Sequence, residues 1–277
     1  MRRALHALFA LALCGMAGGA AHADATPSRL EALATADDGR GWEAVGRLEL
    51  GGGSFCTGAL VGADLVLTAA HCLFDEDSGA RIGTEAIEFR AGFRNGRAEA
   101  YRGIRRAVVH PEYRYLGPDR MDRVAMDVAL LQLDRPIRSA QIRPFAMQEG
   151  LSRGQRVGVV SYAKGRAEAP SLQEVCHVLE RAGGVVMLSC SVDFGASGAP
   201  IFADGAEGPE IVSVVSAKAE AEGRPVALAS AFERTLGILQ EALAAAPEGV
   251  LNRGVPLSER FGDGRESGRL GAKFVRP

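Results

Sequence analysis

The stretch VLTAAHC, residues 66–72, runs from an apolar segment straight into a histidine joined to a cysteine. Ala69 and Ala70 have little bulk, so the backbone at this point can pass close to another element. Cys72 can tie the turn that holds His71 to a neighbouring strand through a disulfide. A general base has to be held still, and these neighbours would hold it, although a histidine that only packs in a core also fits the stretch.

The composition is that of a soluble globular protein, with 277 residues, 47% of them apolar and 24% charged. This length allows one large or two small domains with a sizeable core. The net charge is −2, and the arginines are scattered among acidic residues. No basic field for holding nucleic acid is present, so nucleic-acid binding is not expected.

The N-terminus has the features of a signal peptide over residues 1–23. Two arginines precede an apolar run from about residue 4 to 17, and an A-x-A site follows at residues 21–23. The protein is therefore expected to be exported, to the periplasm or outside the cell. No later stretch approaches the roughly 20 apolar residues of a membrane span, so no membrane contact is expected after cleavage. A lipid anchor at Cys14 is the weaker alternative, because Leu13 is large for such a site.

Cleavage after Ala23 removes one of the five cysteines and leaves an even number. The four that remain are Cys56, Cys72, Cys176 and Cys190. In an oxidising compartment they can form two disulfides with three connectivities, of which pairing between sequence neighbours is the simplest. Each such disulfide would contribute about 3 kcal/mol. No CxxC-type pair is present, so a zinc site is not favoured and no metal is expected.

Short apolar stretches with Gly, Pro, Asn and Asp between them predict a mainly β protein. These stretches are residues 43–50, 55–61, 64–70, 86–93, 128–133, 156–162, 185–190 and 210–217. One helix is predicted in residues 231–246, where Phe232, Leu236, Leu239 and Leu243 recur at helical spacing before Pro247.

The two ends of the chain are polar and are expected to be loosely held. The predicted division is a signal peptide over residues 1–23, an extension over 24–40, a main domain over 41–247 and a Gly/Arg-rich flexible tail over 248–277.

Three histidines remain after the signal peptide, and two of them are poor candidates for chemistry. His110 precedes Pro111 in a polar segment, which predicts a surface loop. His177 follows Cys176 in a predicted strand, where packing or exposure is the simpler role. His71 is therefore the candidate base.

Two further motifs supply groups that a histidine base would use. Asp127 directly precedes the apolar run 128–133, so its carboxylate lies near the core and needs a partner such as an imidazole. Ser197 lies in DFGASGAP, residues 193–200, where Gly195 and Gly198 allow successive N–H groups to point into one concavity. Each motif alone also fits a structural turn or a glycine loop.

Taken together, LTAAHC, DVALLQL and GASGAP resemble the trypsin/chymotrypsin-like serine peptidases, particularly their bacterial secreted branch. The resemblance covers about residues 41–245. It implies an all-β fold of two packed six-stranded antiparallel β-barrels with a C-terminal helix, with the site between the barrels.

The resemblance also implies roles for these residues. Ser197 would be the nucleophile, His71 the base, and Asp127 the group that orients the imidazole. The backbone N–H groups of Gly195 and Ser197 would form the oxyanion hole. The expected protein is a monomer that hydrolyses peptide bonds in a protein or peptide substrate and requires no cofactor.

The sequence departs from the common family motif G-D-S-G-G-P at Ala196 and Ala199. Ala196 cannot form the ion pair with a new N-terminus that activates the animal enzymes, and no I-V-G-G-type segment is present near residue 44. We therefore expect a pocket that is formed without this switch, as in bacterial members similar to glutamyl endopeptidases.

The resemblance places four residues around the substrate pocket: Ser191 at its base, and Ser213, Val214 and Val215 along its wall. Without an aspartate at position 191, a preference for Arg or Lys is unsupported. The two valines would favour small or medium apolar side chains, unless Asp193 alters the pocket. Val212 lies where glutamyl-specific members carry a histidine.

The sequence also allows two other functions. The first is a catalytically silent family member that acts as a binding or adhesion module, which the altered serine motif allows. The second is a periplasmic binding protein with an unrelated β fold, which would require the three motifs to coincide by chance.

Overall fold

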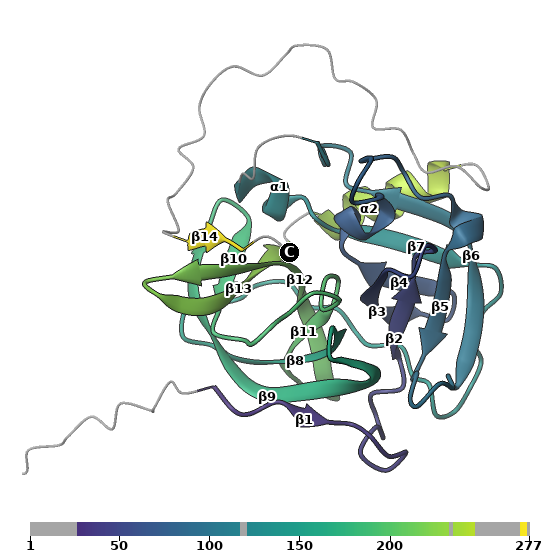
Figure 1. The fold of residues 1–277 in the computed structure, drawn as a ribbon, viewed down its shortest axis with the longest axis horizontal. Helices are drawn as coiled ribbons and strands as arrows, with labels where there is room; N and C mark the ends of the chain where they lie inside the picture. Colours follow the sequence, from purple (N-terminus) through teal and green to yellow (C-terminus); the bar gives the residue numbers. More distant parts are fainter. Residues whose placement is uncertain (1–26, 117–120, 233–234, 247–271, 276–277) are drawn as a thin grey trace, which may run out of the picture.

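In the computed structural model, the chain forms two adjacent β units with helices at their margins (Figure 1). The structure describes residues 27–116, 121–232, 235–246 and 272–275. The predicted signal peptide, Cys14 and residues 247–271 lie outside the described residues.

The first unit is a closed barrel of six antiparallel strands in the order β2-β3-β4-β7-β6-β5. Its strands are β2 Val45–Glu49, β3 Phe55–Gly62, β4 Leu65–Thr68, β5 Glu88–Ala91, β6 Ala100–Val109 and β7 Ala129–Leu133. Large apolar side chains on one face of these strands, Leu48, Leu60, Phe89 and Leu131, are buried. Their burial provides the main driving force for closing this barrel.

The second unit is an antiparallel sheet that contains a ring of six strands. These are β8 Arg156–Ala163, β9 Arg166–Ala182, β10 Val185–Leu188, β11 Pro200–Gly205, β12 Gly208–Ala221 and β13 Arg224–Ala231. They follow the order β9-β10-β13-β12-β11-β8, and pairing of β8 with β9 closes the ring. Two six-stranded antiparallel units are what the resemblance implied, so the predicted fold class is confirmed.

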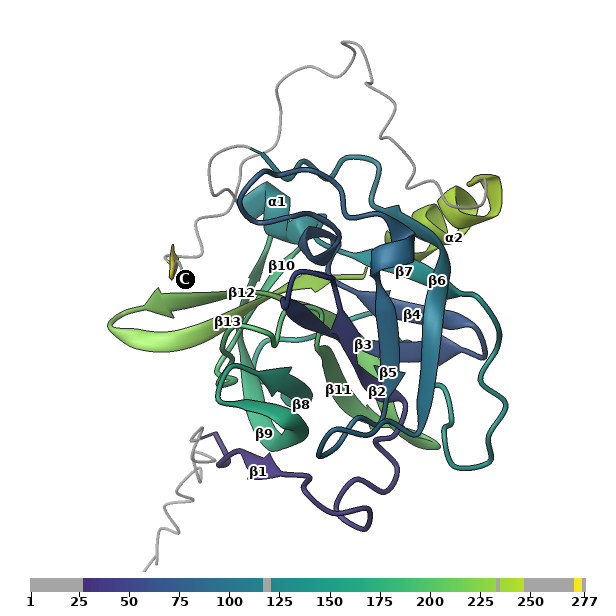
Figure 2. The same cartoon turned by 45° about the vertical axis from the view of Figure 1, so that its right-hand side comes forward.

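The predicted C-terminal helix is confirmed as α2, Thr235–Ala245. Its fully buried Leu239 and half-buried Leu236 and Leu243 belong to the core cluster, and the helix packs on β6 and β7 (Figure 2). Shorter helical segments are η1 Ala70–Leu73, η2 Thr84–Ala86 and α1 Met121–Ala125. Within the described ranges, none of the helices has the length and apolar character needed to cross a membrane.

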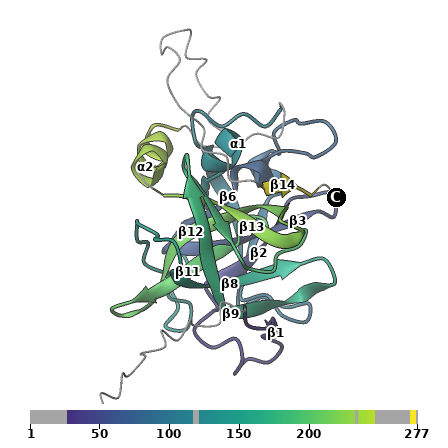
Figure 3. The same ribbon diagram turned by 90° about the vertical axis from the view of Figure 1, so that its left-hand side faces the viewer.

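The expectation of a loosely held N-terminal extension is wrong for residues 28–33. β1, Glu31–Ala32, pairs with β9, and Ser28 N donates to Val175 O at 2.7 Å (Figure 3). Leu33 is buried in the core. The reason is that β10 pairs only with the second half of β9, so the same edge of the first half is free to bond this segment.

The described part of the C-terminal tail is also held in place. Strand β14, Ala272–Phe274, pairs antiparallel with β12. The expected flexibility of the tail is therefore wrong for these residues, because their backbone groups bond to the edge of β12.

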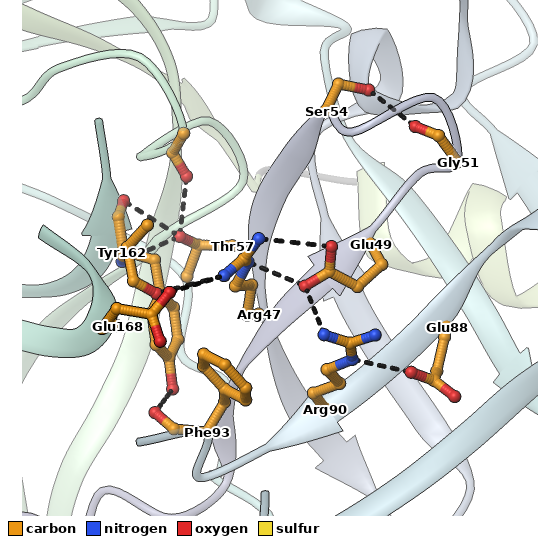
Figure 4. A network of polar contacts seen from close by, with 12 residues as sticks. Arg47, Glu49, Gly51, Ser54, Thr57, Glu88, Arg90, Phe93, Tyr162 and Glu168 are labelled. Atoms are coloured by element: carbon orange, nitrogen blue, oxygen red, sulfur yellow. Dashed lines mark hydrogen bonds and ion pairs between the residues drawn. The ribbon is translucent and has the colours of Figure 1, made fainter. Parts of the chain in front are cut away.

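Thr57 of β3 is fully buried and joins the first barrel to the second (Figure 4). Its Oγ1 accepts a hydrogen bond from Tyr162 N at 3.1 Å and donates one to Gly195 O at 2.9 Å. Its N–H donates to Ser197 O at 2.9 Å, and Thr68 Oγ1 donates to its carbonyl at 2.8 Å. One residue thus links β3, β4, β8 and the loop that carries Ser197.

Contacts around Arg47 of β2 extend this junction (Figure 4). The guanidinium lies 4.4 Å from the ring centroid of Phe55 and 3.7 Å from the carboxylate of Glu168 on β9. The hydroxyl of Tyr162 donates to Phe93 O at 2.8 Å. The two units are therefore connected by directional polar contacts as well as by apolar packing.

The substitution Thr57→Val should destabilise the fold, because it keeps the volume but leaves Tyr162 N–H and Gly195 O without their partner. We expect the free energy of unfolding to fall by about 1–3 kcal/mol. The measurement is urea unfolding, read as a lower midpoint at an unchanged slope.

Thr84→Val is the matched control, because Thr84 is also buried and its hydroxyl makes no hydrogen bond within the described residues. It should change stability by no more than about 0.5 kcal/mol. Equal effects of the two substitutions would contradict the role given to Thr57.

Candidate active site

His71 lies in the short helical turn η1, directly after β4. The next residue, Cys72, forms a disulfide with Cys56 of β3, so the turn is anchored to the neighbouring strand. The second disulfide joins Cys176 and Cys190. Both are pairs of sequence neighbours, the simplest of the three connectivities. Since Cys56 and Cys72 are joined, neither can serve as a thiolate ligand for a metal beside His71.

Asp127 holds His71 by two contacts. Its Oδ2 lies 2.7 Å from His71 Nδ1, and its Oδ1 accepts a hydrogen bond from His71 N at 2.8 Å. The Asp127 side chain is only 4% exposed, so it is shielded from water. A third donor is the hydroxyl of Ser216, 2.5 Å from Asp127 Oδ2. The buried carboxylate thus has the partners that its burial requires.

Ser216 was missed by sequence reasoning. It lies in β12 three positions after Ser213, and nothing in the segment SVVS distinguishes the two serines. The pairing of β12 with β13 shifts register between Val215 and Ala217, which leaves Ser216 as the extra residue of a bulge. Bulges re-aim side chains in this way beside functional sites.

The ring of His71 is affected by two opposing influences. Burial lowers the pKa of His71, but the charge of Asp127 and its hydrogen bond to Nδ1 more than offset this, so the pKa lies above the ordinary value of 6.5. With Nδ1 engaged, Nε2 is the nitrogen left for proton transfer.

The loop of Ser197 is pressed against the first barrel. Gly198 has φ +75°, and a Cβ on it would lie 2.1 Å from Thr68 Oγ1 and 2.4 Å from Thr57 O. Gly195 has φ +93°, and a Cβ there would lie 2.4 Å from the ring of Phe55. Only glycine fits at these two positions, which explains the glycines on either side of Ser197.

Two backbone donors in this loop are left for a ligand. The N–H of Ala196 donates to Asp193 O at 2.9 Å and is therefore occupied. Among the described residues, no acceptor receives a hydrogen bond from the N–H of Gly195 or of Ser197. Free N–H groups at alternate positions can bind one negative oxygen.

One cavity of about 420 Å³ brings the candidate residues of the two units together. Its lining includes His71 and Tyr115 from the first unit, and Phe194, Gly195, Ser197 and Ser216 from the second. The three separate motifs of the sequence therefore meet around one opening, with Asp127 buried behind His71.

The predicted pocket wall is wrong, because its residues are displaced along β12 from those that line the cavity. Of the residues Ser191, Ser213, Val214 and Val215, only Val215 lines the cavity. Ser213 and Val214 are fully buried, and Ser213 Oγ donates to Ser230 O at 2.6 Å. Because of the bulge, the wall is formed further along β12, by Ala217 and Lys218. The preference inferred from the two valines loses its basis.

Ser191 lies outside this cavity as well. It is exposed, and its N–H donates to Gln173 Oε1 at 2.7 Å. The neighbouring Val192 and Asp193 line the cavity instead.

The surface position predicted for His110 is also wrong. His110 is 5% exposed, and its Nδ1 accepts a hydrogen bond from Glu112 N at 3.2 Å. Burial lowers its pKa, which favours the neutral ring. The reason is that His110 follows β6 and bonds through its N–H to Val128 O. His177 is half-buried in β9, as its strand position predicted.

The family described as trypsin-like peptidase domain matches residues 56–208, more than half of the chain. The chain belongs to the trypsin-like peptidases. The matched segment of this trypsin-like peptidase contains His71, Asp127 and Ser197, the three candidate residues.

Curated relatives match over part of their length. Human cathepsin G is 32% identical over 117 residues, which cover 41% of this chain and 41% of the relative. Human mannan-binding lectin serine protease 1 is 29% identical over 125 residues, which cover 40% of this chain and 17% of the relative. The trypsin-like peptidase thus spans less than half the length of these relatives.

A solved structure of a Glu endopeptidase in complex with MPD is similar to this trypsin-like peptidase. The TM-score is 0.59 at 16% sequence identity, and the match covers 74% of this chain and 92% of that one. At this identity the likeness shows the fold alone, which is chymotrypsin-like.

Asp127→Asn should lower the pKa of His71. The change removes the charge that raises this pKa and leaves the opposing effect of burial in place. The ring then stays neutral to lower pH than in the parent chain. NMR titration of the histidine ring protons measures this directly. His110 in the same spectra is the internal control and should keep its lowered pKa, and an unchanged pKa of His71 would contradict the assignment of Asp127 as its counterion.

Proposed function

We propose that this trypsin-like peptidase is an exported serine endopeptidase that hydrolyses peptide bonds through His71, Asp127 and Ser197. The observation that carries the proposal is the short contact between Asp127 and His71, on a ring that lines the same cavity as Ser197. The proposed peptidase domain covers residues 41–247.

In the proposed mechanism, Ser197 Oγ attacks the carbonyl carbon of the scissile bond while its proton passes to His71 Nε2. The carbonyl oxygen becomes negative and accepts hydrogen bonds from the N–H groups of Gly195 and Ser197, each worth about 3–4 kcal/mol. Asp127 holds the tautomer and stabilises the imidazolium.

His71 then donates this proton to the departing amine, and the C–N bond breaks to leave an ester on Ser197. Water attacks the ester with His71 again as base, and the acid product leaves. Since the base acts in its neutral form, activity should rise with pH through the raised pKa of His71.

The proposed site does not depend on activation by cleavage near residue 44. Ala44 is 1% exposed, and its carbonyl accepts a hydrogen bond from Leu60 N at 2.9 Å. Val45 begins β2 and is fully buried. This segment is therefore part of the first barrel, and the buried methyl group of Ala196 offers no charge for a new N-terminus to pair with.

Export is supported by the features of residues 1–23 and by the two disulfides, which persist in oxidising compartments. The proposed destination is the periplasm or the outside of the cell.

A fluorophosphonate probe tests the proposed nucleophile. We expect it to label the purified chain on Ser197 at neutral pH and to lose labelling in His71→Ala. Cleavage of a mixed peptide library should fall at least about 10⁴-fold in Ser197→Ala. The matched control is Ser191→Ala, which lies in the same segment outside the cavity and should keep both signals. A folded parent chain that is neither labelled nor active would indicate a silent binding module instead.

The proposed peptidase should also be active without cleavage near residue 44. A chain that begins at residue 24 should react with the probe while intact mass spectrometry shows no loss of residues 24–44. Appearance of labelling only after a cut in this segment would overturn the preformed site.

A further inference from the structure

Different segments of the chain pair with successive parts of the β12 edge that faces the site. β11 pairs with it only as far as Val214. The loop of Ser197 continues along this edge, since Gly198 N donates to Val215 O at 2.8 Å and Val215 N donates to Ala199 O at 2.9 Å. β13 occupies the opposite edge along residues 213–221. Beyond the loop, β12 is therefore open to a further strand.

β14 occupies this part of the edge (Figure 1, in yellow beside β12). The register aligns Ala219 with Phe274 and Ala221 with Ala272. The pairing extends one residue further, because Val275 N donates to Lys218 O at 3.0 Å. This segment is about 50 residues distant in sequence, and backbone hydrogen bonds hold it to the wall of the cavity.

The segment also reaches the candidate active site. Val275 lines the same cavity as His71 and Ser197. β12 leads away from Ser197 as its residue numbers rise, and β14 is antiparallel to it, so β14 leads towards Ser197. The side chain of Lys218 also contacts the loop of Ser197, with its Nζ 3.4 Å from Asp193 Oδ1.

An extended peptide that adds to an exposed strand edge gains affinity from backbone hydrogen bonds whatever its sequence. The edge of β12 next to Ser197 is suited to bind a peptide substrate in this way. A segment of the chain that uses the same carbonyl of Lys218 excludes such a substrate.

We propose that residues 272–275 act as a pseudosubstrate that occupies the edge of β12 and inhibits the peptidase in cis. This inference rests on the proposed endopeptidase activity. Because residues 272–275 belong to the same chain as β12, their effective concentration at its edge is about 1 mM. If the segment binds this edge with a dissociation constant of about 0.1 mM, the edge is open to substrate in about one molecule in ten.

The first experiment compares the chain of residues 24–277 with one that ends at residue 246. Removal of the segment should raise kcat/KM for a peptide library about tenfold, mainly through KM, because competition is lost. A synthetic peptide of residues 272–277 should inhibit the shorter chain competitively. A peptide of the same composition in scrambled order is the control for non-specific effects. Equal kcat/KM for two folded chains would overturn the inference.

A point variant avoids reliance on the truncation. Val275→Pro removes the N–H that bonds to Lys218 O and should raise kcat/KM about fivefold. Val275→Ile keeps both the N–H and a branched side chain, and it should match the parent. If the proline and isoleucine variants behave alike, the hydrogen bond does not hold the segment in place and the inference fails.

A binding measurement separates this inference from the proposed activity, because it needs no catalysis. A fluorescein-labelled peptide of residues 272–277 should bind the shorter chain, by anisotropy, and bind the full chain about tenfold more weakly. Binding without any fluorophosphonate labelling of either chain would refute the proposed function and leave the docking site standing. No difference in binding between the two chains would refute the docking site, whether or not Ser197 is labelled.

Discussion

The close approach between the Ser197 loop and the first barrel is the constraint on which the site depends. Gly198 lies where any side chain would collide with Thr68 Oγ1 and Thr57 O. Thr57 then bonds the loop on both sides of Ala196, through Gly195 O and Ser197 O. Neither unit contains a complete site, so the position of Ser197 relative to His71 is set by this contact between units.

Much of the architecture could be predicted from apolar periodicity. Each of the eight apolar stretches contains a strand, because a strand that buries one or both faces has to carry apolar residues. Strands β6, β9, β11 and β13 lie outside these eight stretches, although a strand was predicted at His177 of β9. β6 carries Arg102, Arg105 and Arg106, and only five of the 17 residues of β9 are buried. Their place in a sheet is decided by partners that are distant in sequence.

Some features of the site were predicted from the sequence, and others were not. The contact of Asp127 with His71 was expected, since a carboxylate at the edge of a core needs a partner. The residues that form the wall of the cavity were not predicted, because the bulged residue Ser216 changes which side chains of β12 face the cavity. The burial of His110 likewise arises from the segments that close over the end of β6. A register shift within a strand, or burial by segments distant in sequence, cannot be predicted from the local sequence pattern.

Both β units close on themselves, and closed sheets leave no strand edge open to other molecules. Strands β9 and β12 nevertheless extend past some of their neighbours, and a segment from near each end of the described chain covers these parts. These segments therefore contribute to colloidal behaviour as well as to structure. A preparation trimmed at its ends would keep its folded barrels but expose bare edges of the kind through which β proteins self-associate.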